Sequence, residues 1–149
     1  MSLTVGLGRL LSPPVTRGGI DGVSKFFDLR WESSEVVRMA IRPDLINAAG
    51  LLSGVATYAL VDYCIGSTLW RETTDEEAIA TISIAINYVA TATEGDVICR
   101  TTLDRRNRRL AVLRSEVTAE EGEHLGGNAR LLATALGSYT IFPRRKIEP

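Results

Sequence analysis

The chain has 149 residues, with 17 Lys or Arg and 18 Asp or Glu, so its formal net charge is −1. This length predicts one domain that buries most of its apolar surface without disulfide bonds or structural metals. The near balance of charge argues against a strongly electrostatic nucleic-acid binder. The two cysteines, Cys64 and Cys99, lack the spacing of a metal site, so we expect reduced core residues in a cytoplasmic protein without cofactor or metal.

The N-terminal quarter of the chain predicts little regular structure. Residues 1–12 have the leucine spacing of a short amphipathic helix, and the Gly- and Pro-rich segment that follows, up to Val23, predicts a loop. The start lacks the order of features that marks a signal peptide. Residues 26–31 and 36–41 favour two short strands, the second closed by Pro43. We therefore divide the chain into an N-terminal helix and loop (1–24), one domain (25–143) and a tail (144–149).

Residues 50–70 form an apolar run whose only ionisable carboxylate is Asp62. Apolar residues recur on nearly every side, which predicts a helix enclosed by protein. A membrane span of this length is disfavoured, because Asp62 lies near its centre and no basic cluster marks either flank. A lone acid in such a helix is costly to bury unless it is paired, protonated or used in function.

The second half of the chain predicts a series of long strands. These are residues 78–88, 96–103, 110–118 and a last strand from about Leu125 to Phe142, in which Gly137 is expected to form a bulge or bend. Residues 104–109, with four arginines, predict a hairpin tip. Residues 119–127 predict a polar loop that carries the only histidine, His124. One helix followed by a run of strands indicates an α+β fold with an antiparallel sheet.

Three stretches resemble the PaaI-type hot-dog acyl-CoA thioesterases over about residues 35–143. The stretch 47–62, NAAGLLSGVATYALVD, is similar to the family's central-helix motif: Asn47, Gly50, Gly54 and Asp62 match it. The stretches TISIAINYVATATEGD (81–96) and ATALGSYTIFP look like the family's next strand and turn and its closing strand. Ser53 and Val55 depart from the usual His and second Gly, and Thr91 or Ala92 stands near the usual Pro. The resemblance implies a hot-dog fold, with the sheet wrapped around the helix.

Thioester hydrolysis requires an activated water or attacking carboxylate, together with stabilisation of charge on the carbonyl oxygen. Asp62 can serve the first need as general base or nucleophile. The Gly54 amide, near the helix start, can polarise the carbonyl. The resemblance adds Asn47, beside Gly54, and Thr81, where the family often has a Ser or Thr that binds water or the acid.

Gly54 and Asp62 are eight residues apart, which is about 12 Å along a helix. One chain therefore cannot bring both to one carbonyl, whereas two antiparallel copies of the helix can. The resemblance implies such a homodimer, often paired again into a homotetramer, with an acyl-CoA substrate and neither nucleic acid nor membrane as partner.

Other interpretations of the same residues remain open. Asp62 can be a structural acid satisfied by hydroxyls such as that of Thr81, Asn47 a helix cap and Gly54 a site of close helix packing. The arginines at 105, 106, 108 and 109 suit either a solvated tip or the phosphates of coenzyme A. A non-catalytic hot-dog module that binds acyl thioesters or serves assembly is the alternative function. A serine hydrolase based on Ser53 lacks the G-x-S-x-G elbow, and a dehydratase requires a His beside the Asp.

Overall fold

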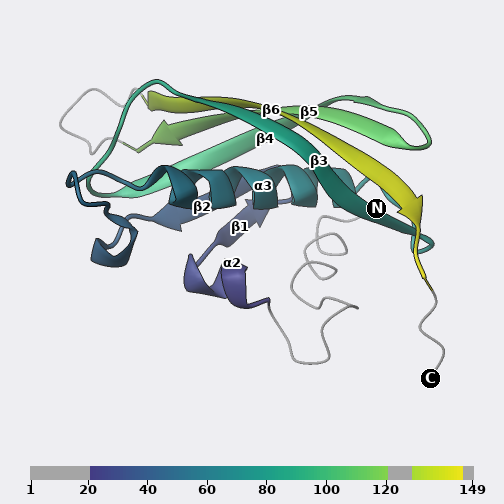
Figure 1. Ribbon diagram of the computed structural model, residues 1–149, viewed down its shortest axis with the longest axis horizontal. Helices are drawn as coiled ribbons and strands as arrows, with labels where there is room; N and C mark the ends of the chain where they lie inside the picture. The colour runs from purple at the N-terminus through teal and green to yellow at the C-terminus, as the bar shows by residue number, and fades with distance from the viewer. Residues whose placement is uncertain (1–20, 121–128, 146–149) are drawn as a thin grey trace.

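The computed structural model describes residues 21–120 and 129–145 (Figure 1). A long helix, α3 (Gly54–Trp70), lies against a six-stranded antiparallel sheet. Across the sheet the strands follow the order β1 (Arg30–Ser33), β2 (Val36–Ala40), β4 (Asp96–Arg106), β5 (Leu110–Ala119), β6 (Arg130–Pro143) and β3 (Glu77–Tyr88). Two short helices, α2 (Gly22–Phe26) and η1 (Pro43–Leu45), complete the described elements. This arrangement confirms the predicted α+β fold, with the sheet curved around one central helix.

Helix α3 is enclosed on most sides, as its apolar sequence predicts. Leu60, Ile65 and Leu69 are fully buried in a core that also contains Val37 and Met39 of β2. Cys64 of α3 and Cys99 of β4 are both buried and free, in agreement with their expected core positions. Within the described ranges, no helix is both long enough and apolar enough to cross a membrane.

Three successive helix-facing positions of β6 are occupied by small residues. Ala133, Ala135 and Gly137 are buried there. A Cβ atom added to Gly137 would lie 2.9 Å from Cδ1 of Ile65 in α3, closer than real contacts allow. Of the bulge or bend expected at Gly137, the bulge is absent, because this residue pairs in register with Ile84 of β3 and Leu113 of β5. Gly137 provides space for the helix.

The N-terminal part of the described chain differs from the expected loop and strand. Residues 22–26 form α2 because the side chain of Asp21 caps it, accepting hydrogen bonds from the amides of Val23 (3.0 Å) and Ser24 (3.1 Å). The first strand therefore starts only at Arg30, and α2 crosses the predicted boundary at residue 24. The helix predicted for residues 1–12 lies outside the described residues.

The later strands agree with the predicted ones apart from their ends. Strand β4 continues to Arg106, so the hairpin tip is shorter than expected. The tip is closed by Asn107, whose side-chain oxygen accepts from the amides of Arg109 (2.9 Å) and Leu110 (2.8 Å). The last strand is described from Arg130 onwards, and the polar loop with His124 lies outside the described residues.

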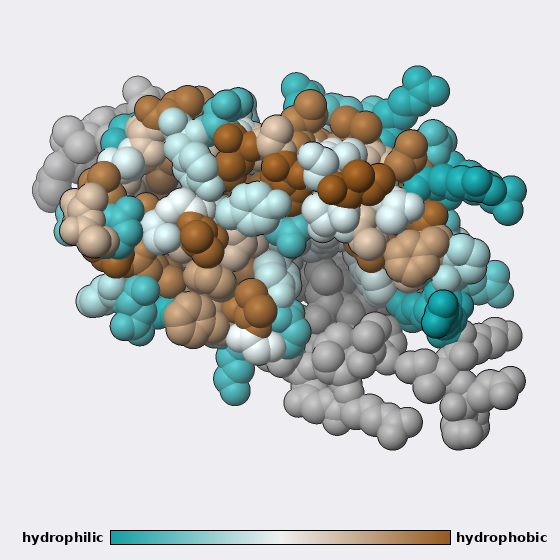
Figure 2. All heavy atoms as spheres, viewed as in Figure 1, coloured by the Kyte–Doolittle hydropathy of each residue, from teal (hydrophilic) through white to brown (hydrophobic). Residues whose placement is uncertain are grey.

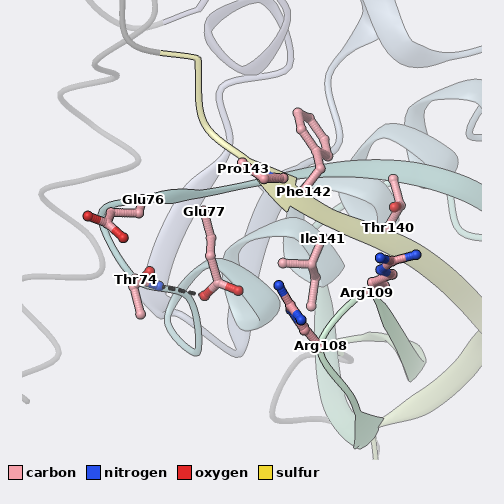
Figure 3. A pocket seen from close by; sticks show the side chains of 9 residues that line it. All are labelled: Thr74, Glu76, Glu77, Arg108, Arg109, Thr140, Ile141, Phe142 and Pro143. Carbon is pink, nitrogen blue, oxygen red and sulfur yellow. Dashed lines mark hydrogen bonds between the residues drawn. The ribbon is translucent and has the colours of Figure 1, made fainter.

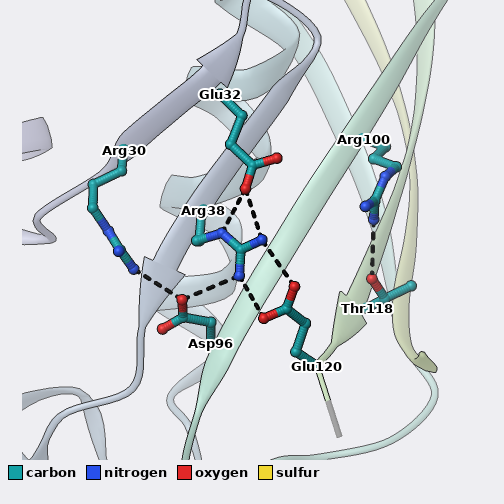
Figure 4. Close-up of polar contacts among 7 residues, drawn as sticks. All are labelled: Arg30, Glu32, Arg38, Asp96, Arg100, Thr118 and Glu120. Carbon is teal, nitrogen blue, oxygen red and sulfur yellow. Dashed lines mark hydrogen bonds and ion pairs between the residues drawn. The ribbon is translucent and has the colours of Figure 1, made fainter. Parts of the chain in front are cut away.

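A group of ion pairs centred on Arg38 fastens the β1 edge of the sheet (Figure 4). The Arg38 guanidinium of β2 contacts Glu32 of β1 (2.7 Å), Asp96 of β4 (3.2 Å) and Glu120 after β5 (2.6 Å). These carboxylates raise the pKa of Arg38. The group therefore links four segments of the chain around one permanently charged side chain.

We expect Gly137→Ala to lower the free energy of unfolding by about 1–3 kcal/mol, because the new methyl group overlaps Ile65 in a close-packed core. Urea denaturation of the variant and the wild type measures the difference. Adding Ile65→Val removes the overlapping atom, so the double variant should be destabilised by less than the sum of the two single changes.

Gly66→Ala is the matched control. No atom lies within 4 Å of the Cβ it would add, so alanine should stabilise α3 by about 0.5–1 kcal/mol. Wild-type stability of Gly137→Ala would contradict the proposed close packing.

Candidate active site

The carboxylate of Asp62 lies where α3 meets β3 and β6. Its Oδ1 accepts hydrogen bonds from the hydroxyl of Thr81 in β3 (2.9 Å) and from the hydroxyl of Tyr139 in β6. Thus the contact with Thr81 expected of a structural acid is present, but Asp62 is only half-buried. No described residue donates a hydrogen bond to its second oxygen, Oδ2. Among the described residues, the carboxylate is therefore held through Oδ1 alone.

Tyr139 holds Asp62 from the sheet side. Its side chain is buried, and its hydroxyl also lies 3.1 Å from the backbone carbonyl of Asp62. Burial raises the pKa of Tyr139, and the hydrogen bond to the Asp62 carboxylate raises it further. The phenol therefore keeps its proton across the physiological range and remains a donor to Oδ1.

A β-bulge brings Thr81 to the same carboxylate. Between β3 and β6 the register changes from Thr81 opposite Tyr139 to Ser83 opposite Ser138, so Ile82 is an extra residue in β3. Ile79 on one side of the bulge, and Ile84 on the other, both pack against the core. Side chains of a strand alternate between the two faces of the sheet, and the extra residue Ile82 reverses this alternation. Thr81 before the bulge and Ile84 after it can therefore both face α3 and the core.

The amide of Gly54 lies at the other end of the site, at the first residue of α3. Ser53 caps the helix, with its hydroxyl accepting from the amide of Val55 (3.2 Å), and no described residue accepts from the amide of Gly54. An outer cavity of about 430 Å³, open on the surface, lies at this helix start and is lined by Ser53, Gly54, Val55, Tyr58 and Tyr88. A free amide at a helix N-terminus favours a partially negative ligand atom at this position.

Asn47 is not the cap of α3. The helix starts at Gly54 rather than near Gly50, and Ser53 occupies the capping position. The side-chain oxygen of Asn47 instead accepts from the amides of Ala49 (2.9 Å) and Leu51 (3.2 Å), closing a turn in which Gly50 has a positive φ of 79°. This turn brings Asn47 beside Gly54, since both line a small inner cavity of about 150 Å³.

The structure therefore groups the four predicted residues into two pairs. Asn47 lies with Gly54, and Thr81 lies with Asp62. Eight helical residues, or about 12 Å, separate the two pairs within one chain. Sequence reasoning missed Tyr139 and Tyr88. Tyr139 follows Ala135 and Gly137 at alternate positions of the closing strand, a spacing that places it on the helix-facing side.

The arginines of the β4–β5 hairpin lie near the other end of α3. Arg106 is paired with Glu77 (2.6 Å), whereas Arg108 and Arg109 line a cavity of about 570 Å³ that also contains Glu76, Thr140 and Phe142 (Figure 3). Contact of this tip with the phosphates of coenzyme A stays a prediction. Among the described residues, no group of three or more His, Cys, Asp or Glu side chains is placed to hold a metal ion.

Solved structures with a similar fold carry low sequence identity. The BH2602 protein from Bacillus halodurans, solved with CoA, is 18% identical over 95% of this chain and 86% of its own, with a TM-score of 0.73. A mutant of thioesterase PA1618 from Pseudomonas aeruginosa is 15% identical (83% and 88% covered, TM-score 0.73). The TT0310 protein from Thermus thermophilus is 23% identical (80% and 97% covered, TM-score 0.69). Among curated proteins, none matches this chain.

The model of the thioesterase superfamily matches residues 49–125, just over half of the chain. The match includes α3 with Gly54 and Asp62, and strand β3 with Thr81. This protein therefore belongs to the thioesterase superfamily, and its fold is the hot-dog fold of that family.

Proposed function

We propose that this protein is an acyl-CoA thioesterase in which Asp62 acts as general base or nucleophile and the Gly54 amide of a partner chain polarises the thioester carbonyl. The observation that carries the proposal is the state of the Asp62 carboxylate. Its Oδ1 is fixed by two hydroxyls, while Oδ2 has no donor among the described residues and lies on a half-exposed part of α3. A purely structural acid would not need an open oxygen at an accessible position.

The edge of the sheet supports a second copy of the chain as partner. Strand β3 is an edge strand of twelve residues, and it carries no charge or proline between Ala78 and Tyr88. Such an unprotected edge is a template for pairing with another strand. Ile82 of β3 is 55% exposed and Val55 of α3 is 72% exposed, and Figure 2 shows hydrophobic side chains spread over this face of the molecule.

Pairing of β3 with its copy about a two-fold axis places the two α3 helices antiparallel. Gly54 of one chain then approaches Asp62 of the other, which removes the 12 Å separation. Such a dimer has two sites, each with Asn47 and Gly54 from one chain, and Thr81, Asp62 and Tyr139 from the other. Further pairing of dimers into a tetramer is compatible with this arrangement.

As a general base, Oδ2 of Asp62 takes a proton from water while the water oxygen adds to the thioester carbonyl carbon. The Gly54 amide donates to the carbonyl oxygen as it becomes negative. When the tetrahedral intermediate collapses, the C–S bond breaks and the thiolate takes the proton from Asp62. As a nucleophile, Oδ2 attacks the carbonyl carbon directly, the C–S bond breaks, and the CoA thiolate leaves an acyl–Asp62 anhydride. Water then hydrolyses this anhydride to the carboxylic acid and the Asp62 carboxylate, and a proton of that water goes to the thiolate. Thr81 and Tyr139 hold the carboxylate in place in both routes.

The CoA in the structure of the similar BH2602 protein supports CoA as the thiol carrier here. We place the enzyme in the cytoplasm, where acyl-CoA is available and the two cysteines stay reduced.

Asp62→Asn should lower kcat by about 10²–10⁴-fold, because the amide cannot take a proton from water or attack the carbonyl. Release of free CoA thiol measures turnover. The asparagine oxygen still accepts from Thr81 and Tyr139, so urea denaturation should show a folded protein. Asp104→Asn makes the same chemical change on β4, where the aspartate pairs with Arg114, and should keep wild-type turnover. Undiminished hydrolysis by Asp62→Asn would refute the mechanism.

Comparison of Gly54→Pro with Gly54→Ala distinguishes the effect of losing the Gly54 N–H from the effect of filling the space beside it. Proline suits the first position of a helix but has no N–H, whereas alanine keeps the N–H and adds a similar Cβ near the ring of Tyr88. We expect Gly54→Pro to lose about 10²–10³-fold in kcat relative to Gly54→Ala. Equal kcat for the two variants would exclude the amide as a carbonyl ligand.

A mixed dimer tests whether each site is shared between chains. One chain carries Asp62→Asn and the other Gly54→Pro, each with its own affinity tag, so that heterodimers can be purified. If the chains share sites, one site has both changes and the other has neither, so up to half of the wild-type activity should return. If Gly54 and Asp62 of the same chain act together, the heterodimer should be as inactive as its parents.

The non-catalytic alternative rests on Ser53 and Val55 in place of the family's usual residues. In that case the wild-type chain would bind acyl-CoA without releasing thiol, whatever the acyl group. A thiol-release assay over a graded series of acyl-CoA substrates distinguishes the two functions.

A further inference from the structure

Tyr88 stands between two cavities at the start of α3. The outer cavity of about 430 Å³ is open on the surface and is lined by Gly54 together with Ser53, Val55 and Tyr58. The inner cavity of about 150 Å³ lies among Leu51, Leu52, Thr57, Ala90 and Leu132. Only Gly54 and Tyr88 line both cavities. The Tyr88 ring is therefore the side-chain wall that the two spaces share.

The ring is held in this position although half of its surface is exposed. The Tyr88 hydroxyl donates a hydrogen bond to the backbone carbonyl of Gly54 (2.8 Å). The ring also lies against the Cα of Gly54, since a Cβ added there would be 3.3 Å from the ring. Burial raises the pKa of Tyr88, and the nearby Tyr58 raises it further, so the phenol remains a neutral donor. The hydrogen bond and the ring contact together hold the Tyr88 ring against Gly54 at the start of α3.

The inner cavity suits a small uncharged group. Its described lining contains no charged side chain, and half of its residues are leucine or alanine. An apolar protein cavity of about 150 Å³ accommodates a molecule of the size of benzene. A group of roughly six carbon atoms therefore matches the volume of this cavity.

We propose that Tyr88 is the specificity-determining residue for the acyl group, which lies in the inner cavity and is limited by the ring to a short chain or a single six-membered ring. This inference rests on the proposed function, because it assumes that the thioester carbonyl lies against the Gly54 amide at the junction of the two cavities. Removal of the ring joins the inner cavity to the outer one and makes room for longer acyl groups.

Hydrolysis of butanoyl-, hexanoyl- and decanoyl-CoA by the wild type, Tyr88→Phe and Tyr88→Ala tests the proposal. For the wild type, kcat/KM should fall from hexanoyl to decanoyl. Tyr88→Phe keeps the ring and loses only the hydrogen bond to Gly54, so it should keep this preference. Tyr88→Ala should raise the decanoyl-to-butanoyl ratio of kcat/KM by at least about tenfold. An unchanged ratio in Tyr88→Ala would overturn the assignment.

A binding experiment separates this inference from the proposed hydrolysis. The S-butyl and S-decyl thioethers of CoA cannot be hydrolysed, and calorimetry measures their Kd for the same three proteins, each checked for folding by circular dichroism. If Tyr88→Ala alone binds S-decyl-CoA more tightly relative to S-butyl-CoA than the wild type does, the role of the ring is supported. This conclusion holds even if no chain releases thiol. Identical selectivity in the wild type and Tyr88→Ala, or no binding by any folded chain, refutes it even if hydrolysis is found.

Discussion

The packing of the Ile65 side chain of α3 against Gly137 of β6 is the constraint on which the rest of the site depends. Gly137 lets Ile65 pack directly against the strand, where a larger residue would overlap it. Asp62 precedes Ile65 by about one helical turn, and Tyr139 follows Gly137 on the same face of β6. The distance between helix and sheet at Gly137 therefore sets whether the hydroxyl of Tyr139 reaches the carboxylate of Asp62. Because Gly137 has no side chain, the packing of the core also positions Tyr139 for its hydrogen bond to Asp62.

In the proposed mechanism, the described chain holds two incomplete halves of a site. The half with Asp62 supplies a carboxylate anchored through one oxygen, and the half with Gly54 supplies a free amide at a helix start. A rigid helix keeps the two halves apart, so no side-chain motion within one chain can join them. The unprotected edge of β3 is the feature that favours pairing with a second copy. In the proposed mechanism a site is complete only in the dimer, so activity requires dimer formation.

The start of α3 is held by residues other than those usual in the motif that this chain resembles. Ser53 stands where the family usually has His, and here it caps the helix. Asn47 closes the preceding turn, and Tyr88 donates to the carbonyl of Gly54. Three polar side chains thus hold the backbone around Gly54 while its amide points to no described acceptor. The departures from the motif leave the Gly54 amide without an acceptor among the described residues, as the proposed mechanism requires.

The sequence by itself determined the helix with its lone acid, most of the strands and the antiparallel sheet, because apolar periodicity and turn residues act locally. The resemblance also placed Asn47, Gly54 and Asp62 in one motif, and Thr81 where the family often has a Ser or Thr. Only the tertiary structure decided that Ser53 caps the helix, since two nearby polar residues competed for that position. The bulge at Ile82 and the contacts of Tyr139 and Tyr88 depend on strand register and on the helix-to-sheet distance. Those quantities are set by residues far apart in the chain, so no local pattern encodes them.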